Sequence, residues 1–449
     1  MSNEEYILGL DLGTKKVAAL LGHSRNGQLS LCGVGLAAAE GMRRGEIVDL
    51  EKASASIAQA IRNLQTNAGS IAPQGNASSP RGRALAGVKI PHSIWVGITG
   101  DHIRCFNPHA SISITRPGRA VTARDVEEVM REAVQSVSLP IGHEVIHVIA
   151  RTFAVDALPG QTPSPKDGVP AKYSTLLRNS IANPVGMPAS RLEVQAHVIA
   201  AASTALGLLE RAVEQAGLAV EGVVLEPLAS ADAVLSEAER DLGVTLIDIG
   251  AGTTDIAIFV EGAICYTGAL ALGGSHVTRD LALGLEIELD EAETLKLASG
   301  AALTDTIGPE ERVNIRPLSA DVSRQIPRQM LVSIIQPRAV EMLSLAKEKM
   351  VNSGFFHRAA TGAVLTGGGS QLIGLLPIAK QILGVPVRLG RPIARGPAEL
   401  KNPSFATGVG LLLYGSHEQV AAPPVVSWPQ VKPKLAARLA AWWKHLFGP

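Results

Sequence analysis

The sequence predicts an α/β protein made of two halves that share one local pattern. Candidate strands, loops and helices alternate along almost the whole chain, which is typical of the α/β class. A short apolar strand, then an acidic residue, then a glycine turn with hydroxyl residues occurs at residues 11–14 and again at 248–255. Two equivalent loops on two halves of a protein can close on one ligand from opposite sides.

Composition and charge exclude several classes of protein. The chain has 449 residues, of which 46% are hydrophobic and 3% aromatic, so we expect a large core of aliphatic side chains. Lysine plus arginine equals aspartate plus glutamate, 41 of each, whereas proteins that bind nucleic acid usually have a basic surplus. Cys32, Cys105 and Cys265 are scattered and lack the spacing of metal ligands. With neither a signal peptide nor an apolar run of about 18 residues in the sequence, a cytoplasmic protein is expected.

The two loops contain the residue types that bind phosphate. Glycine lets backbone N–H groups point at phosphate oxygens, and Thr14, Thr253 and Thr254 add hydroxyl donors. Asp11 and Asp248 would repel phosphate in direct contact, but they suit a hydrated Mg²⁺, which takes a few carboxylates together with water and phosphate oxygens. The alternative is that both stretches are tight turns that bind nothing. The repetition of the loop, each time after a buried strand, favours a nucleotide between two domains.

The first half of the chain predicts hairpins, helices and two long loops. Hairpins lead from the N-terminus to a helix near residues 53–64, and the Gly-, Ser-, Pro- and Ala-rich stretch 66–87 is predicted to be a flexible insertion. A second long loop is expected at 160–188. The remaining elements are expected in this order: a strand at 88–98, a helix at 122–137 that begins with a capping box, strands at 143–157 and 191–200, a helix at 203–217 and a strand at 220–225.

The second half continues the alternation after the second loop. A strand is expected at 263–272, helices at 277–283, 290–298 and 331–350, a strand at 363–366 and a last core element at 406–414. Beyond Gly415 the composition shifts to Pro, Val, Gln and Lys, which predicts an extended linker.

The final residues predict an amphipathic helix that lies on a membrane. At about 100° per residue, one broad apolar stripe is formed by Leu435, Leu439, Trp442, Trp443, Leu446 and Phe447. Lys434, Arg438 and His445 lie beside or opposite it, and tryptophan next to cationic side chains suits the headgroup region of a bilayer. The alternative is a helix that packs back onto the protein's own core. The terminal position and the proline-rich linker before it argue against that alternative.

Several of these motifs together resemble a known family. Residues 11–14, the pair Glu226-Pro227, residues 248–255 and residues 365–369 occur in the order of the actin-like ATPase fold. Within that superfamily the chain resembles the FtsA family of bacterial cell-division proteins. This closer likeness lies in residues 45–51, 145–149, 183–187 and 191–199, and it covers nearly the whole chain. The resemblance implies an actin-like fold of two ribonuclease-H-like halves, with an inserted subdomain called IC and a C-terminal amphipathic helix.

The resemblance also implies boundaries and site residues. The subdomains would be IA at 1–87 and 201–242, IC at 88–200, IIA at 243–274 and 329–400, and IIB at 275–328, followed by a core helix at 401–415, a linker at 416–433 and the amphipathic helix at 434–449. Asp11 and Asp248 would hold the hydrated Mg²⁺, and Glu226 matches the position that orients the attacking water in some relatives. The alternative for Glu226 is a residue that only begins a helix. The nucleotide would be bound by Gly13, Thr14, Lys16, Gly250, Gly252, Thr253, Thr254 and Gly274, with Glu293 and Lys296 on the ribose side and Gly367, Gly368 and Gly369 near the adenine.

The chain departs from the family pattern in three places. The stretches 66–87 and 160–182 are longer than the family needs, and Ala251 stands where a third glycine is common. Its methyl group is small, so nucleotide binding is still expected.

The implied function is that of an ATP-binding protein that polymerises on the inner face of the cytoplasmic membrane, at the division site. Its expected partners are FtsZ, other division proteins, further copies of itself and membrane lipid, but not nucleic acid. ATP binding is a safer expectation than rapid turnover, since the family is not one of vigorous ATPases. The alternatives are a pilus-assembly protein of the PilM kind and a small-metabolite kinase with the same fold. A kinase would need a catalytic base at a small-molecule pocket and no lipid-binding tail.

Overall fold

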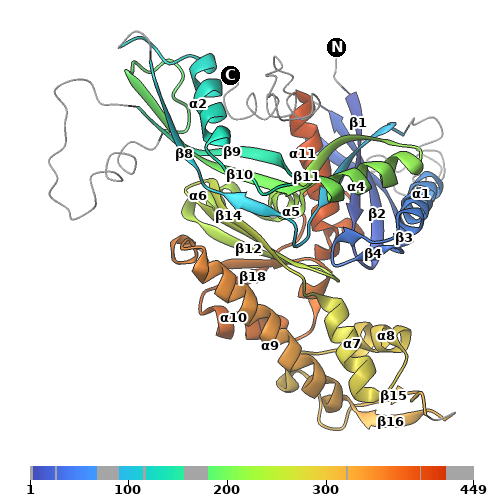
Figure 1. Cartoon of the computed structure of the whole chain (residues 1–449). Coiled ribbons are helices and arrows are strands. Elements are labelled where there is room, and N and C mark those ends of the chain that lie inside the picture. Colours follow the sequence, from blue (N-terminus) through green and yellow to red (C-terminus); the bar gives the residue numbers. More distant parts are fainter. Residues whose placement is uncertain are drawn as a thin grey trace, which may run out of the picture. The chain divides into compact units, whose positions relative to one another are not determined.

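The computed structural model describes residues 4–25, 28–67, 90–114, 118–155, 181–319, 322–394 and 396–420. The predicted insertions at 66–87 and 160–182 lie almost wholly outside these ranges, and the predicted amphipathic helix at 434–449 lies outside them entirely. The described residues form two compact units (Figure 1). The first contains the residues up to His102, then Ala205–Gly262 and Thr267–Ser416, and the second lies mainly between Ile103 and Thr204.

The first unit contains two five-stranded sheets built on the same plan. The first sheet has the order β11-β6-β1-β2-β3, and the second has the order β14-β13-β12-β17-β18. Each sheet contains an antiparallel hairpin, β1 with β2 and β12 with β13, whose two strands are joined at one of the glycine motifs, residues 11–14 or 248–255, called the phosphate-type loops below. On its other side the first strand of each hairpin pairs with a parallel strand, β1 with β6 and β12 with β17. This repetition confirms the predicted α/β class and the two related halves.

The strands of these sheets are largely buried because their sequences are apolar. The first sheet consists of β1 (Glu4–Leu12), β2 (Lys16–Arg25), β3 (Gln28–Ala38), β6 (Ser93–Ile98) and β11 (Ala219–Leu225). The second consists of β12 (Val244–Ile249), β13 (Thr254–Val260), β14 (Ala263–Leu270), β17 (Ala363–Thr366) and β18 (Val387–Leu389). The prediction placed residues 93–98 in IC, but β6 lies between β11 and β1 of the first sheet.

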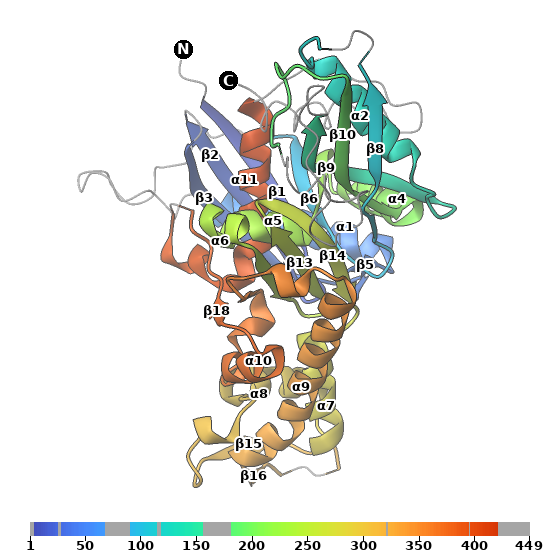
Figure 2. The ribbon, with the colours of Figure 1, turned by 90° about the vertical axis from the view of Figure 1, so that its left-hand side faces the viewer.

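Helices and short elements complete the first unit. They are β4 (Met42–Arg43), β5 (Glu46–Ile47), α1 (Leu50–Asn67), α4 (Ser203–Gln215), α5 (Glu226–Val234), α6 (Glu237–Leu242), α7 (Gly274–Leu285), α8 (Leu289–Ser299), β15 (Arg312–Ile315), β16 (Arg324–Pro327), α9 (Arg328–Asn352), α10 (Leu375–Leu383) and α11 (Ala406–Val420). Five 3-10 turns accompany them: η1 (Thr304–Thr306), η2 (Phe356–Arg358), η3 (Gly368–Gln371), η4 (Ala398–Lys401) and η5 (Pro403–Phe405). Figure 2 shows α7, α8, β15 and β16 gathered at one end of this unit. Among the helices of the described ranges, none has the length and apolar character needed to cross a bilayer.

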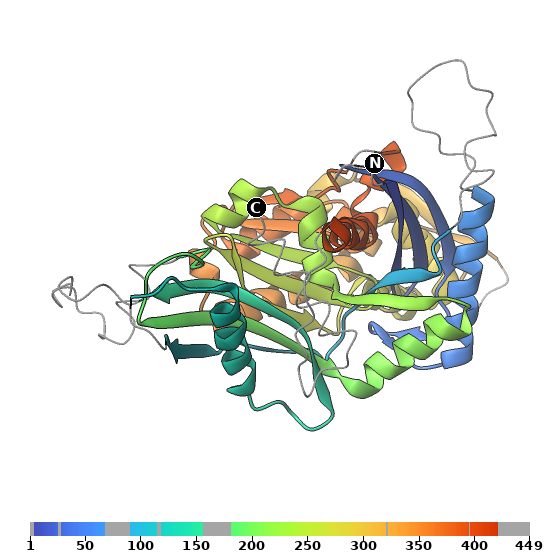
Figure 3. The ribbon, with the colours of Figure 1, turned by 90° about the horizontal axis from the view of Figure 1, so that it is seen from above.

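Helix α11 packs closely against the first sheet and against α5. A Cβ on Gly9 of β1 would lie 3.3 Å from the carbonyl oxygen of Gly408, and a Cβ on Gly410 would lie 1.8 Å from the carbonyl oxygen of Ala229. Figure 3 shows α11, in red, seen end-on beside the blue strands of the first sheet. The helix continues to Val420, which is five residues into the segment predicted to be a linker.

The second unit contains a small sheet covered by one helix. Its elements are β7 (Arg104–Phe106), β8 (His109–Ser113), α2 (Ala123–Gln135), β9 (His143–Val155) and β10 (Arg191–Ala202), with β10 paired to the other three strands. The predicted capping box is present, because Thr122 and Asp125 bond each other's backbone. A hydrogen bond from Arg119 holds the pKa of Asp125 well below its usual range. The carboxylate of Asp125 in the first turn of α2 is therefore negatively charged at neutral pH.

Candidate functional site

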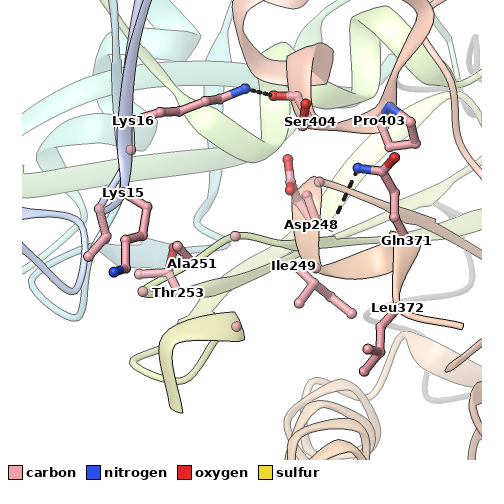
Figure 4. Close-up of a pocket in the computed structure, with 18 of the residues that line it drawn as sticks. Lys15, Lys16, Asp248, Ile249, Ala251, Thr253, Gln371, Leu372, Pro403 and Ser404 are labelled. Atoms are coloured by element: carbon pink, nitrogen blue, oxygen red, sulfur yellow. Dashed lines mark hydrogen bonds between the residues drawn. The ribbon is translucent and has the colours of Figure 1, made fainter. Parts of the chain in front are cut away.

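Both phosphate-type loops line one cavity of about 660 Å³ in the first unit. Nearly all of the predicted site residues are brought together there, namely Asp11, Gly13, Thr14, Lys16, Glu226, Asp248, Gly250, Gly252, Thr253, Gly274, Glu293, Lys296, Gly367, Gly368 and Gly369. Figure 4 shows Lys15, Ala251 and Thr253 on one side of this cavity and Gln371, Leu372 and Pro403 on the other. The volume lies within the range of about 300–1,000 Å³ that is usual for small-molecule sites.

Thr254 is the predicted binding residue that the structure does not place on the cavity wall. Its side chain is buried, and its hydroxyl donates to the carbonyl oxygen of Leu272 at 2.9 Å. Successive side chains of a strand point to opposite faces, so Thr253 faces the cavity while Thr254, the first residue of β13, turns away. The sequence could not show which of the two adjacent threonines has which direction.

Glycine is required in the loops because other backbone and side-chain atoms come close. A Cβ on Gly252 would lie 2.2 Å from Oγ1 of Thr14, so the second loop touches the first at this point. A Cβ on Gly13 would lie 2.9 Å from the carbonyl oxygen of Lys16, which closes the first loop. The two loops therefore form one continuous wall with exposed backbone, a surface that suits phosphate oxygens.

Three buried aspartates, Asp11, Asp248 and Asp255, converge on this wall together with Glu226. Burial raises the pKa of Asp11, Asp248 and Asp255, to about 6 for Asp248 and about 7 for Asp255. Burial, with repulsion from Asp11, Asp255 and Asp248, raises the pKa of Glu226 well above its ordinary value. Such a group of carboxylates is costly without a cation beside it.

The donor set at the loops fits Mg²⁺. Asp11 and Asp248 are each 7% exposed, and both line the cavity. Within the residues that the structure describes, no group of three or more His, Cys, Asp or Glu could hold a metal ion by itself. The pair Asp11 and Asp248 agrees with Mg²⁺, which usually takes one or two carboxylates and completes its shell with phosphate oxygens and water.

Lys16 connects the first loop to the segment before α11. Its Nζ donates to the carbonyl oxygen of Ser404 at 2.6 Å (Figure 4). The same Nζ lies 4.0 Å from the centre of the Phe405 ring. Burial lowers the pKa of Lys16, and the nearby Asp11 and Asp248 act in the opposite direction. The lysine thus places a cation between the two loop aspartates and η5.

A polar network and several apolar side chains line the part of the cavity beside Gly274, whose N–H donates to the carbonyl oxygen of Gly250 in the second loop. Lys296 Nζ lies 2.9 Å from Glu293 Oε2 and donates to the Gly274 carbonyl oxygen at 3.1 Å, and the Thr278 hydroxyl also donates to Glu293. Apolar side chains here come from α7, α8, α9 and the segment after η3: Val277, Leu297, Met342, Leu372 and Ile373. A flat apolar ring could lie on this side while its sugar meets the Glu293–Lys296 pair.

The hairpin of β4 and β5 forms a further wall that sequence reasoning did not assign to the site. Its turn contains Arg44 and Gly45 with φ values of 53° and 79°, and the Gly45 N–H donates to Oγ1 of Thr14 at 3.2 Å. A Cβ on Gly45 would lie 2.9 Å from Cγ2 of Thr99 and 3.2 Å from Cγ2 of Thr253. The only local signal for this turn is an Arg-Gly pair between two strands of two residues each, so its contact with the loops could not be foreseen.

Replacing Gly45 with alanine is expected to lower the affinity for a nucleoside triphosphate by about tenfold, because the new methyl group would push the turn off both loops. The matched control is Gly142→Ala in the second unit, where φ is +74° and nothing lies within 4 Å of the added Cβ. Backbone strain is then similar in the two variants. Equal affinity in the two variants, measured by calorimetry, would show that the contact with the loops does not matter.

Comparisons with known proteins point to one family. The family model described as "Cell division protein FtsA" matches residues 245–410, and the model described as "SHS2 domain inserted in FTSA" matches residues 100–165. A curated FtsA from Pseudomonas aeruginosa is 36% identical over 416 residues, which are 92% of this chain and 90% of the relative. FtsA from Escherichia coli strain K12 is 31% identical over 455 residues, which are 99% of this chain and 97% of the relative.

Among solved structures, similarity extends to a more distant protein. The structure described as a PilM-PilN type IV pilus biogenesis complex has a TM-score of 0.60 and 18% identity, and the match covers 91% of this chain and 98% of that one. At this identity the likeness concerns the fold alone.

Proposed function

The chain belongs to the FtsA family of cell-division proteins and has the actin-like ATPase fold, and from this premise we propose that it binds Mg-ATP and forms polymers that tether FtsZ to the cytoplasmic membrane. The observation that carries the proposal is the single cavity lined by both phosphate-type loops. A nucleotide held by both loops would link the two sheets of the first unit. The occupancy of the cavity could therefore set how these two halves are joined.

The roles proposed for the cavity residues come from the family resemblance and agree with their chemistry. Asp11 and Asp248 would hold the hydrated Mg²⁺, which would offset the charge of the phosphates when bound. Glycine backbone and the hydroxyls of Thr14 and Thr253 would donate to phosphate oxygens. Glu293 and Lys296 would contact the ribose, with the adenine beside Gly367–Gly369 and the apolar side chains near them.

Glu226 would orient a water molecule in this proposal, and it also begins a helix. It is the first residue of α5 and lines the cavity, so the two predicted roles are compatible. Burial and the neighbouring carboxylates raise its pKa. Nucleotide binding, rather than rapid turnover, is the central part of the proposal.

The proposed partners are those that the family resemblance implies. FtsZ would bind residues 275–328, which include α7, α8, β15 and β16, and IC would contact the neighbouring subunit of the polymer. The predicted tail helix at 434–449 would bind lipid. One short helix binds weakly and reversibly, but a polymer presents many copies, so avidity would hold the assembly on the membrane.

The direct test is electron microscopy of the full chain on an anionic lipid monolayer, with and without Mg-ATP. The proposal expects ordered polymers on the monolayer that depend on ATP. Protein that binds the monolayer without polymers in either condition would contradict the polymer part. ATP-dependent phosphorylation of a small metabolite would favour the kinase alternative.

Deleting residues 434–449 is expected to release the protein from anionic liposomes, with at least tenfold less protein in the vesicle pellet. Two charge-matched variants separate apolar insertion from electrostatics. Leu439→Glu lies on the predicted apolar stripe, and Ala437→Glu lies on the opposite face at about 100° per residue. Leu439→Glu should weaken sedimentation with vesicles much more than Ala437→Glu. An equal loss in both variants would mean that charge alone controls binding.

A further inference from the structure

Two hydroxyl groups contact the same oxygen of the Asp248 carboxylate, Oδ2. Ser230 of α5 is fully buried, and its Oγ donates to Oδ2 of Asp248. Thr407 of α11 lies with Oγ1 3.4 Å from the same oxygen and 3.0 Å from Oγ of Ser230. Three elements, α5, β12 and α11, therefore meet at one oxygen atom.

The other oxygen of Asp248 has room because a glycine stands beside it. A Cβ on Gly367 would lie 2.2 Å from Oδ1 of Asp248, and the φ of Gly367 is +82°. Asp248, Gly367 and Thr407 all line the cavity, whereas Ser230 does not. Ser230 can thus affect a ligand in the cavity only through the residues that it contacts, such as Asp248 and Thr407.

Helix α5 also carries Glu226, the residue proposed to orient water. Glu226 and Ser230 are four positions apart, so they lie on one face of the helix about one turn from each other. A hydroxyl in a helix interior often bonds the carbonyl oxygen one turn back. Ser230 instead reaches a carboxylate on β12, which joins the helix that bears Glu226 to the strand that bears Asp248.

We propose that Ser230, assisted by Thr407, is a positioning residue that fixes the Asp248 carboxylate in the orientation needed to hold the hydrated Mg²⁺ of the nucleotide. This inference rests on the proposed function. The two hydroxyls occupy Oδ2, and Gly367 leaves space for Oδ1, so the carboxylate has one favoured rotamer. Without the two hydroxyls the Asp248 carboxylate would rotate within the pocket, and the metal would lose a preorganised ligand.

The test measures ATP affinity by calorimetry in Mg²⁺ and in EDTA. Ser230→Ala is expected to lower the affinity in Mg²⁺ by about tenfold, as for loss of a hydrogen bond to a charged group, and to leave the affinity in EDTA within about twofold. Thr407→Val should lower it in Mg²⁺ by about threefold, since its contact is longer, while Thr407→Ser should retain the normal Mg²⁺ response. If Ser230→Ala does not fold, the comparison of Thr407→Val with Thr407→Ser still tests the positioning role.

The matched control is Thr245→Val on β12, the strand that carries Asp248. Thr245 is fully buried, its hydroxyl has no hydrogen-bond partner among the described residues, and it does not line the cavity. The Thr245→Val variant should keep the normal difference in ATP affinity between Mg²⁺ and EDTA. If Ser230→Ala and Thr407→Val weaken binding equally in Mg²⁺ and EDTA, or not at all, the positioning role is wrong. If the unmodified protein shows no Mg²⁺-dependent ATP binding, the proposed function itself fails.

Discussion

Replacing Gly410 with alanine is expected to destabilise the protein by about 3 kcal/mol or more. Gly410 lies in α11, and a Cβ there would lie 1.8 Å from the carbonyl oxygen and 2.2 Å from the carbonyl carbon of Ala229. Both atoms belong to the backbone of α5, so no side-chain rotation can relieve the overlap. The two helices must separate, and the packing of α11 on Leu20 of β2 must loosen with them.

The matched control is Gly207→Ala in α4. This glycine is also helical, but nothing lies within 4 Å of an added Cβ. Alanine usually stabilises such a position by about 0.5–1 kcal/mol relative to glycine. Urea unfolding should therefore move the two midpoints in opposite directions. A small or equal effect in the two variants would show that α5 and α11 are not in the close contact described.

Replacing Asp248 with asparagine is expected to weaken Mg-ATP binding by about 100-fold or more, since the metal loses a charged ligand. The same change should stabilise the protein without nucleotide. Burial raises the pKa of Asp248 to about 6, so the folded protein holds this proton more tightly than the unfolded chain does. The stability from this proton is full below the unfolded pKa and is lost as pH rises through about 6. Asparagine has no proton to lose, so its stability advantage should grow as pH rises from about 4 to about 6 and stay constant above that.

Calorimetry and thermal unfolding at pH 5 and pH 8 check both parts of this prediction. Asp241→Asn is the control, because Asp241 is exposed at the end of α6 and does not line the cavity. It should bind Mg-ATP normally. Unchanged Mg-ATP affinity in Asp248→Asn would remove Asp248 from the metal site.

The sequence could predict the parts of the site that depend on local chemistry. Asp11, Asp248 and the loop glycines are adjacent in short motifs, so their residue types alone indicate phosphate and metal. Thr99, Gly45 and Thr407 reach the cavity from elements that are distant in sequence and meet only after folding. No local pattern marks them, because a single threonine or glycine occurs in many turns and strands.

Assigning strands to sheets depends on the same distant contacts. The apolar run at 93–98 predicts a strand, but its place between β1 and β11 depends on pairing with residues on both sides in the chain. The boundary between the first sheet and the second unit could therefore not be set from the sequence. Helix α11 continues beyond its predicted end for a different reason. Gly415 suggests a helix end, but its missing side chain instead lets the helix pass close to Trp95. A Cβ on Gly415 would lie 2.7 Å from the Trp95 ring.

The position of α11 also affects how the protein is made. During synthesis the hairpin of β1 and β2 leaves the ribosome long before residues 406–420, at about 5–20 residues per second. One face of this hairpin later contacts Leu411 and Leu412 of α11. That face stays uncovered for on the order of tens of seconds, until the helix has been made. The nascent chain therefore exposes this apolar surface until α11 has been made. A chain interrupted before α11 would retain both phosphate-type loops but would be a substrate for proteolysis rather than a smaller working protein.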